Sequence, residues 1–197
     1  MSDPNRERLL ELLVKFSYVE GEVTLASGRK SNFYVDCRQT VLRAEGHQYT
    51  GRVFLDIIRS QFPTARAVGG VVLGACPIAS AVSMQSALDG APLPAFYLRK
   101  EPKGHGMGKL LEGPVAAGTP VVVVEDVVTT GGSTLKAIES ARAEGLHVLG
   151  VVALVDREEN EAAATLSAQL PFFAVFTRTD IMAAGAAASA DAARRNS

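Results

Sequence analysis

The chain has 197 residues, 47% of them hydrophobic and 21% charged, with a formal net charge of −1. This composition predicts one soluble globular domain spanning residues 1–197 and excludes disordered and fibrous proteins. The near-neutral charge argues against a nucleic-acid partner, and the two widely spaced cysteines, Cys37 and Cys76, indicate a reducing cytoplasm rather than a disulfide framework or a zinc site.

Short valine-rich runs alternate along the chain with segments of helical spacing. This pattern predicts an α/β fold with a doubly wound parallel sheet, covered by helices on both faces. We expect strands at 32–37, 66–72, 95–99, 120–125, 147–155 and 172–176, and helices at 4–16, 45–61, 77–88, 133–144 and 160–169.

Membrane insertion and export are both disfavoured. The uncharged segment 67–88 is long enough to cross a bilayer. Its glycines, proline and serines favour a buried strand, a tight turn and a buried helix instead. The N-terminus mixes charges with leucines and lacks the apolar core of a signal peptide, so we expect no membrane partner and no export.

Two regions depart from the alternating pattern. Residues 98–113, LRKEPKGHGMGKLLEG, are glycine-rich and basic, which predicts a long mobile loop. Residues 182–197 are biased towards alanine, which predicts a fraying helix or, as we expect, a flexible tail.

The segment VVVVEDVVTTGGST, residues 121–134, joins a predicted buried strand to a predicted helix. In open α/β sheets, ligands bind where parallel strands end. Gly131 and Gly132 allow backbone N–H groups to approach an anion, and the hydroxyls of Thr129, Thr130, Ser133 and Thr134 add donors at a helix N-terminus. The segment therefore predicts a phosphate cradle, although an ordinary capped turn is the simpler alternative.

Glu125 and Asp126 would repel a phosphate, so they need another partner on the same ligand. Sugar hydroxyls, hydrated magnesium or a developing positive charge would each suit a pair of carboxylates. A ribose phosphate offers the first two together. The segment is not a Walker loop, because GxxxxGK[ST] does not occur.

This segment closely resembles the phosphoribosyl-diphosphate (PRPP) binding motif of type I phosphoribosyltransferases. The resemblance implies that the loop holds the 5-phosphate and the acids contact the ribose hydroxyls. It also implies Mg²⁺ as the cofactor, held mainly through PRPP, with Glu125 and Asp126 as candidates to reach it through water. The motif residues implied to bind PRPP are Glu125, Asp126, Val127, Val128, Thr129, Thr130, Gly131, Gly132 and Ser133.

The basic loop suits a pyrophosphate leaving group, whose growing negative charge needs positioned cations. Taken alone, it fits a solvated surface loop equally well. Its RKEPKGHG segment resembles the catalytic loop of the orotate phosphoribosyltransferase family, which implies a homodimer whose loop reaches the neighbouring active site. The residues implied to bind PRPP and to act in catalysis are Arg99, Lys100, Lys103 and His105, with Asp126 as a further catalytic residue and Lys103 or His105 as the donor of a proton or charge.

Arg157 follows the apolar run VLGVVALVD, so it lies at the carboxyl edge of a buried strand. It could grip a planar acceptor on a base or pair with Glu158 or Glu159. LVDRE resembles the family's orotate-contacting segment, and the resemblance implies that Arg157 and Thr129 bind orotate.

The segment LASGRKSNFYVDCR resembles the family's hood, which implies a hood from about residues 1–40 and part of the C-terminal region, with Phe33 and Tyr34 beside the base. A turn entering a half-buried edge strand is the alternative for these aromatic residues. Some family branches have lysines at the position of Ala26 and near Gly74, and those contacts cannot be carried over. Cys76 stands where an acid is frequent, and an inert thiol is favoured over a nucleophile.

The resemblance therefore implies Mg²⁺-dependent transfer of phosphoribose from PRPP to orotate in pyrimidine biosynthesis. A purine phosphoribosyltransferase is one alternative, but it leaves Arg157 and the basic loop without a role. A non-catalytic regulator that binds nucleotides and RNA is another, and the near-neutral charge weighs against it.

Overall fold

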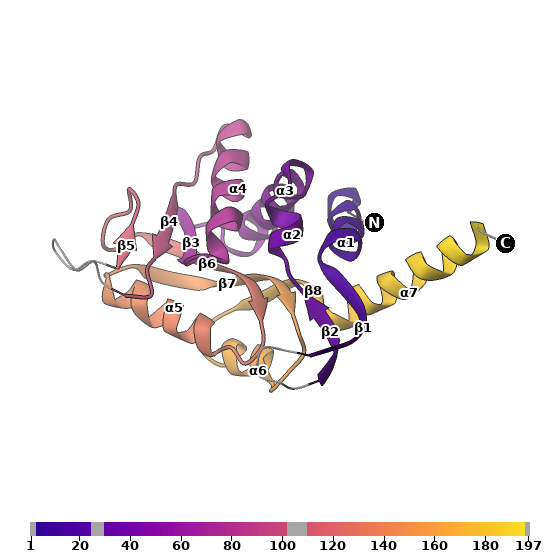
Figure 1. The fold of residues 1–197 in the computed structure, drawn as a ribbon. Helices are drawn as coiled ribbons and strands as arrows, with labels where there is room; N and C mark the ends of the chain where they lie inside the picture. The colour runs from indigo at the N-terminus through magenta and orange to yellow at the C-terminus, as the bar shows by residue number, and fades with distance from the viewer. Residues whose placement is uncertain (1–2, 25–29, 102–109, 196–197) are drawn as a thin grey trace.

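The computed structural model describes residues 3–24, 30–101 and 110–195, and a six-stranded sheet lies at its centre (Figure 1). The strand order is β5-β4-β3-β6-β7-β8, and the neighbouring strands are parallel except for the antiparallel pair β4 and β5. The strands of this sheet are β3 (Ala67–Val71), β4 (Ala95–Leu98), β5 (Leu111–Glu112), β6 (Pro120–Val128), β7 (His147–Asp156) and β8 (Phe172–Thr177).

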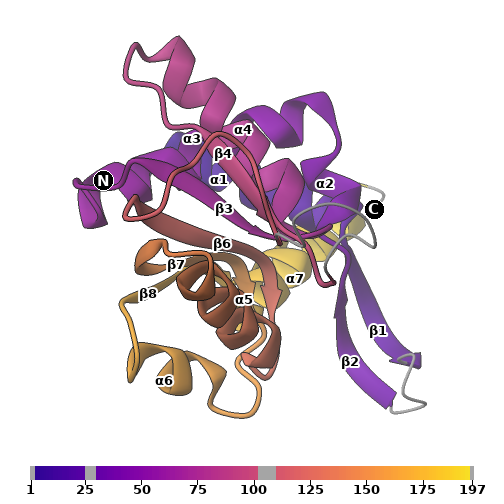
Figure 2. The same cartoon turned by 90° about the vertical axis from the view of Figure 1, so that its left-hand side faces the viewer.

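The helices lie on both faces of this sheet, as a doubly wound fold requires (Figures 1 and 2). One core contains side chains of α1, α3 and α4, and a second core on the opposite face contains side chains of α5 and α6. The helices are α1 (Pro4–Phe16), α2 (Arg38–Val41), α3 (Ala44–Gln61), α4 (Ala75–Leu88), α5 (Gly132–Ala143), α6 (Ala162–Ser167) and α7 (Arg178–Arg195).

The four valines of β6 explain why this strand lies in the middle of the sheet. Successive side chains of a strand point to opposite faces. Val122 and Val124 accordingly pack in the core beneath α3 and α4, whereas Val121 and Val123 pack in the core beneath α5. All four are almost completely buried, so the run supplies apolar side chains to the cores on both faces of the sheet.

Local signals set the ends of several helices. Asp3 caps α1 by accepting a hydrogen bond from the backbone N–H of Asn5 at 2.9 Å, and Pro4 occupies the first turn. Gly145 follows α5 with a φ of +83°, a left-handed conformation that glycine adopts without strain.

A separate two-stranded antiparallel sheet stands beside the main sheet (Figure 2). It consists of β1 (Tyr18–Thr24) and β2 (Lys30–Val35). Tyr18 and Phe33 join the base of this sheet to the main core, and their ring centroids are 5.7 Å apart. Helix α7 begins beside this small sheet and extends away from the body (Figure 1).

The structure confirms the predicted α/β class and finds every predicted strand and helix, with shifted ends. Sequence reasoning missed β1, α2 and β5, and it ended β6 three residues early, at Glu125 instead of Val128. The expectation of a flexible tail over 182–197 is corrected, because α7 is helical as far as Arg195. Residues 25–29 and 102–109 lie outside the described residues.

Segment 67–88 forms β3, a tight turn and α4, as expected from its glycines and proline. Within the described ranges, no helix combines the length and apolar character that crossing a membrane requires.

Candidate active site

The predicted phosphate cradle lies where β6 gives way to α5. Gly131, at the N-cap of α5, has a φ of +76°, so the turn requires a residue that adopts the left-handed region. The side chains of Thr130 and Ser133 are exposed, and Thr129 is half-buried. Three hydroxyl-bearing residues thus surround the open N-terminus of a 12-residue helix, which favours an anion.

Thr134, which sequence reasoning added to the cradle, has a different role. Its side chain is completely buried, and its hydroxyl donates to Oε2 of Glu125 at 3.4 Å. Thr134 therefore positions the side chain of Glu125 and does not face the cradle.

Glu125 and Asp126 lie within β6, so their side chains leave the strand towards opposite faces. Glu125 is turned towards α5, where it meets Thr134. Only 7% of Glu125 is exposed, and burial, followed by the negative charge of Asp126, raises its pKa to about 8. The predicted strand ended at Glu125, whereas β6 runs on to Val128, so Asp126 also lies within the strand.

Asp126 is half-buried and is turned towards the N-terminus of α4. One of its oxygens, Oδ1, accepts a hydrogen bond from the backbone N–H of Val127 at 2.9 Å. A Cβ atom on Gly74 would lie 2.5 Å from the same oxygen, so only glycine leaves room for this carboxylate. Sequence reasoning did not detect this contact, because Gly74 and Asp126 are far apart in the chain.

A cavity of about 600 Å³ opens beside the two acids, a volume typical of small-molecule sites. It brings together residues that sequence reasoning singled out, namely Tyr34, Lys100, Glu125, Asp126, Val127 and Ser133. It also contains residues for which the sequence carried no clear signal, namely Val35, Asp36, Cys37, Arg38 and the segment Val71, Val72, Leu73 and Gly74.

Asp36 and Arg38 form an ion pair on the wall of this cavity. Nε of Arg38 lies 2.8 Å from Oδ1 of Asp36, and this hydrogen bond lowers the pKa of the carboxyl group. The pair follows β2 directly, so it connects the small sheet to the cavity.

The basic segment reaches the same cavity from β4. Lys100 lines both the cavity and a neighbouring hollow of about 500 Å³, which Arg99, Ser133 and Lys136 also line. Nη1 of Arg99 lies 3.1 Å from Oε1 of Glu112, so one basic residue of this segment already has an acidic partner. Lys103 and His105 lie outside the described residues.

Arg157 lies at the end of β7, and its guanidinium does pair with an acid. Nη2 is 2.8 Å from Oε1 of Glu159, one of the two acids named as alternative partners, and it also donates to the backbone carbonyl of Phe33 at 3.5 Å. Nε is buried and has no hydrogen-bond partner among the described residues. This unpaired N–H group leaves the guanidinium able to donate a further hydrogen bond to a ligand.

The two aromatic residues of the predicted base site lie in different surroundings. Tyr34 is 38% exposed and lines the cavity, whereas Phe33 is completely buried in the core. The prediction that the Phe33 ring flanks a base is therefore corrected: the ring packs on Tyr18, and the backbone carbonyl of Phe33 accepts a hydrogen bond from Arg157.

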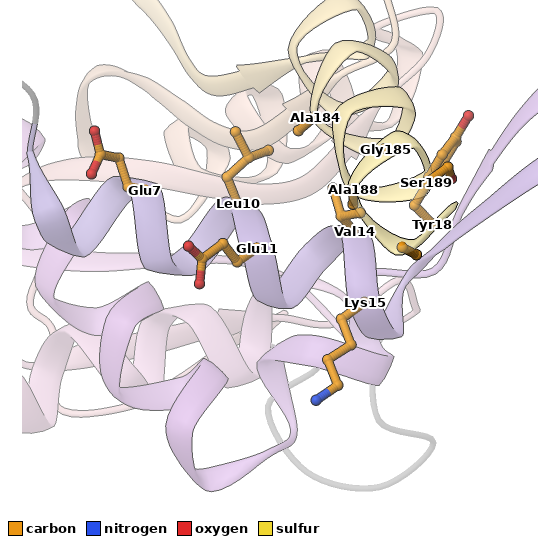
Figure 3. Close-up of a pocket in the computed structure, with 11 residues that line it drawn as sticks. Glu7, Leu10, Glu11, Val14, Lys15, Tyr18, Ala184, Gly185, Ala188 and Ser189 are labelled. Atoms are coloured by element: carbon orange, nitrogen blue, oxygen red, sulfur yellow. The ribbon is translucent and has the colours of Figure 1, made fainter. Parts of the chain in front are cut away.

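A larger groove of about 750 Å³ lies between α1 and α7 (Figure 3). Its walls are mainly apolar or small side chains, among them Leu10, Val14, Ala184 and Ala188. Polar groups able to stabilise a reacting phosphate do not converge there, so the chemistry belongs to the smaller cavity beside Glu125 and Asp126.

Neither cysteine fits a catalytic nucleophile. Both are free thiols, and burial raises the pKa of Cys37 and of Cys76, which favours the unreactive protonated form. In the part of the chain that the structure describes, no group of three or more His, Cys, Asp or Glu side chains could hold a metal ion.

The chain is similar to several proteins named orotate phosphoribosyltransferase. The orotate phosphoribosyltransferase of Sorangium cellulosum is 51% identical over 179 residues, which cover 90% of this chain and 93% of that protein. The Mycobacterium tuberculosis orotate phosphoribosyltransferase, solved in complex with Fe(III) dicitrate, superposes with a TM-score of 0.80 at 38% identity and covers 90% of this chain and 99% of that one. The same M. tuberculosis protein in complex with PRPP gives a TM-score of 0.73 at 35% identity, with coverage of 90% and 99%. No family model matches the chain.

Proposed function

The chain belongs to the orotate phosphoribosyltransferase family, and from this premise we propose how its residues carry out the reaction. The enzyme transfers the phosphoribosyl group of PRPP to orotate, which gives orotidine 5′-monophosphate and pyrophosphate in pyrimidine biosynthesis. The observation that best supports this function is the turn after β6, where the exposed Ser133 lines the same cavity as Glu125 and Asp126.

The turn after β6 holds the 5-phosphate of PRPP. Thr129, Thr130 and Ser133 donate through their hydroxyls, and the backbone from Gly131 to Ser133 donates through N–H groups at the start of α5. Val127 and Val128 continue β6 into this turn and set its direction.

The carboxylates of Glu125 and Asp126 accept hydrogen bonds from the ribose hydroxyls. They also stabilise the positive charge that develops on the ribose as the bond to pyrophosphate breaks. Their oxygen atoms suit Mg²⁺, which typically takes one or two carboxylates together with substrate phosphates and water. When bound with PRPP, this ion would supply partial neutralisation of the diphosphate.

The basic loop receives the departing pyrophosphate. Arg99 and Lys100 lie at its start, and Lys100 already lines the cavity. Lys103 and His105 complete the set of cations, and one of them donates a proton or charge as the leaving group forms.

Arg157 and Thr129 orient orotate for attack on the ribose. The planar guanidinium of Arg157 can donate two parallel hydrogen bonds to a carboxylate or carbonyl group. Tyr34, on the cavity wall, lies against the base. Phe33 positions Arg157 by accepting a hydrogen bond through its backbone carbonyl.

The small sheet, α1 and the start of α7 form a hood over the base, within a single domain of residues 1–197. The working enzyme is a homodimer in which the basic loop of each subunit completes the site of its partner. It acts in the cytoplasm, and its two free thiols fit that reducing compartment.

The loss of orotate absorbance after mixing the protein with orotate, PRPP and Mg²⁺ tests the function, with uracil, adenine and hypoxanthine followed in parallel. We expect rapid turnover confined to orotate. Turnover of adenine or hypoxanthine alone would indicate a purine enzyme instead. PRPP binding without turnover of any base would contradict the catalytic function.

A further inference from the structure

Arg157 and Arg178 occupy equivalent positions at the ends of neighbouring strands. The last register pair of the parallel strands β7 and β8 is Asp156 with Thr177, so each arginine is the next residue of its strand. Adjacent strands lie about 4.8 Å apart. Two guanidinium side chains therefore leave the carboxyl edge of the sheet one strand apart.

Both guanidinium groups lie against the same aromatic ring. The Cζ atom is 5.8 Å from the ring centroid of Phe33 for Arg157 and 5.7 Å for Arg178, within the range of cation–π contacts. Arg178 also donates to the side-chain oxygen of Asn32, the residue before Phe33. Strand β2 thus holds the two arginines together, and its next residue, Tyr34, lines the cavity.

The two guanidinium groups differ in their direct partners. Arg157 pairs with Glu159, but the partners of Arg178 are an amide and an aromatic ring, both neutral. Within the described residues, no carboxylate forms a salt bridge with Arg178.

The acids nearest to Arg178 in sequence are engaged elsewhere. Glu158 accepts hydrogen bonds from the backbone and hydroxyl of Thr179, and Asp180 pairs with Arg6. Arg178 therefore has no acidic side chain in direct contact among the described residues, and the orphan Nε of Arg157 lies at the same edge of the sheet. Such a pair favours a planar anionic ligand.

We propose that Arg178 is a second recognition residue for the carboxylate of the incoming pyrimidine, beside Arg157. This assignment rests on the proposed function, because orotate differs from uracil by that carboxylate. The two guanidinium groups select the anionic base, and the Phe33 ring keeps them in position.

Steady-state kinetics of Arg178→Gln test the assignment. Loss of a charged hydrogen bond predicts an increase of about 10- to 100-fold in KM for orotate. The KM for PRPP and the inhibition constant of uracil, which lacks the carboxylate, should change by less than about twofold. Arg195→Gln, at the exposed far end of α7, is the matched control and should leave all three constants unchanged.

A purely structural role would give a different result. Equal losses towards orotate, uracil and PRPP would overturn the assignment, as would an unchanged KM for orotate in a wild type that turns orotate over. A wild type without orotate turnover would overturn the proposed function, and this assignment with it. If Arg178→Gln does not fold, Arg178→Lys keeps the charge but loses the fork, and we expect the same selective loss at smaller size.

Discussion

The two adjacent acids of β6 differ because their neighbours differ. Glu125 is buried beside Thr134 of α5, whereas Asp126 is half-buried beside Gly74 at the start of α4. In the free enzyme, the raised pKa of Glu125, about 8, keeps its carboxyl group largely protonated at neutral pH. A ligand that brings positive charge or hydroxyl donors to this group favours its ionised form.

Glu125→Gln should alter the pH dependence of stability. In the unfolded chain this carboxyl group ionises near pH 4.5, but in the folded protein only near pH 8. Between these values unfolding releases a proton, so the free energy of unfolding of the wild type falls as the pH rises. The variant lacks this fall. Between pH 5 and pH 8, its free energy of unfolding should therefore rise by about 2–4 kcal/mol relative to that of the wild type, since one pKa unit corresponds to about 1.4 kcal/mol.

Urea denaturation at several pH values measures this difference. Glu139→Gln is the control, because it removes an exposed glutamate from α5 and should leave the pH dependence of the wild type unchanged. Parallel stability curves for Glu125→Gln and the wild type would contradict the prediction.

Gly74→Ala should damage catalysis without removing any polar group. The new Cβ atom would lie 2.5 Å from Oδ1 of Asp126 and would displace that carboxylate. We expect kcat to fall about 10- to 100-fold, the size of effect that a misplaced catalytic group produces. Cys76→Ala, two residues away, should change kcat by less than about twofold because its protonated thiol has no catalytic role. A large loss in the cysteine variant would revive the nucleophile hypothesis.

Among the secondary-structure elements, α7 has its buried residues near its start. Ile181 and Gly185 are its buried residues, and a Cβ atom on Gly185 would lie 2.7 Å from the ring of Tyr18. Beyond this point the side chains are mainly exposed, and the helix continues away from the body (Figure 1). The first turns of α7 therefore hold the small sheet, which also places Arg178.

Ile181→Ala should lower the free energy of unfolding by about 2–4 kcal/mol, because it leaves a cavity in the core. Ala187→Ser, on the exposed part of the same helix, should change it by only about 0.5 kcal/mol. Chemical denaturation of both variants checks the prediction. Equal effects of the two substitutions would mean that α7 does not depend on this anchor.

At the scale of the whole molecule, the basic loop and the cradle are expected to meet across two subunits. Lys103→Ala and Asp126→Asn would then inactivate different halves of one composite site. Subunits mixed after unfolding and refolding should regain about 25% of wild-type activity, since half of the dimers are mixed and each of these has one intact site. Activity that stays at the level of the separate variants would contradict shared sites, and a refolded wild type is the control.

Features that depend on neighbouring residues could be predicted from the amino-acid sequence. A valine run buried on both faces predicts a central strand, and a glycine-rich turn before a helix predicts an anion cradle, because all of these residues lie within 121–134. The sequence did not predict β1, whose residues YVEGEVT include two acids and a glycine, or β5, which has only two residues. The alanine content of the C-terminal residues fitted either a helix or a flexible tail. The packing of Ile181 and Gly185 on other elements favours the helix.

The surroundings of each functional group depend instead on how distant segments pack together. Gly74 meets Asp126 because β3 and β6 are neighbours, and Arg157 and Arg178 meet Phe33 because β7 and β8 end beside the small sheet. These contacts join residues that lie far apart in the chain. Periodicity reports how one segment is buried, but it carries no information on which distant segment covers it. The order of the strands supplies that information, and it determines the burial of Glu125 and the contact of both arginines with Phe33.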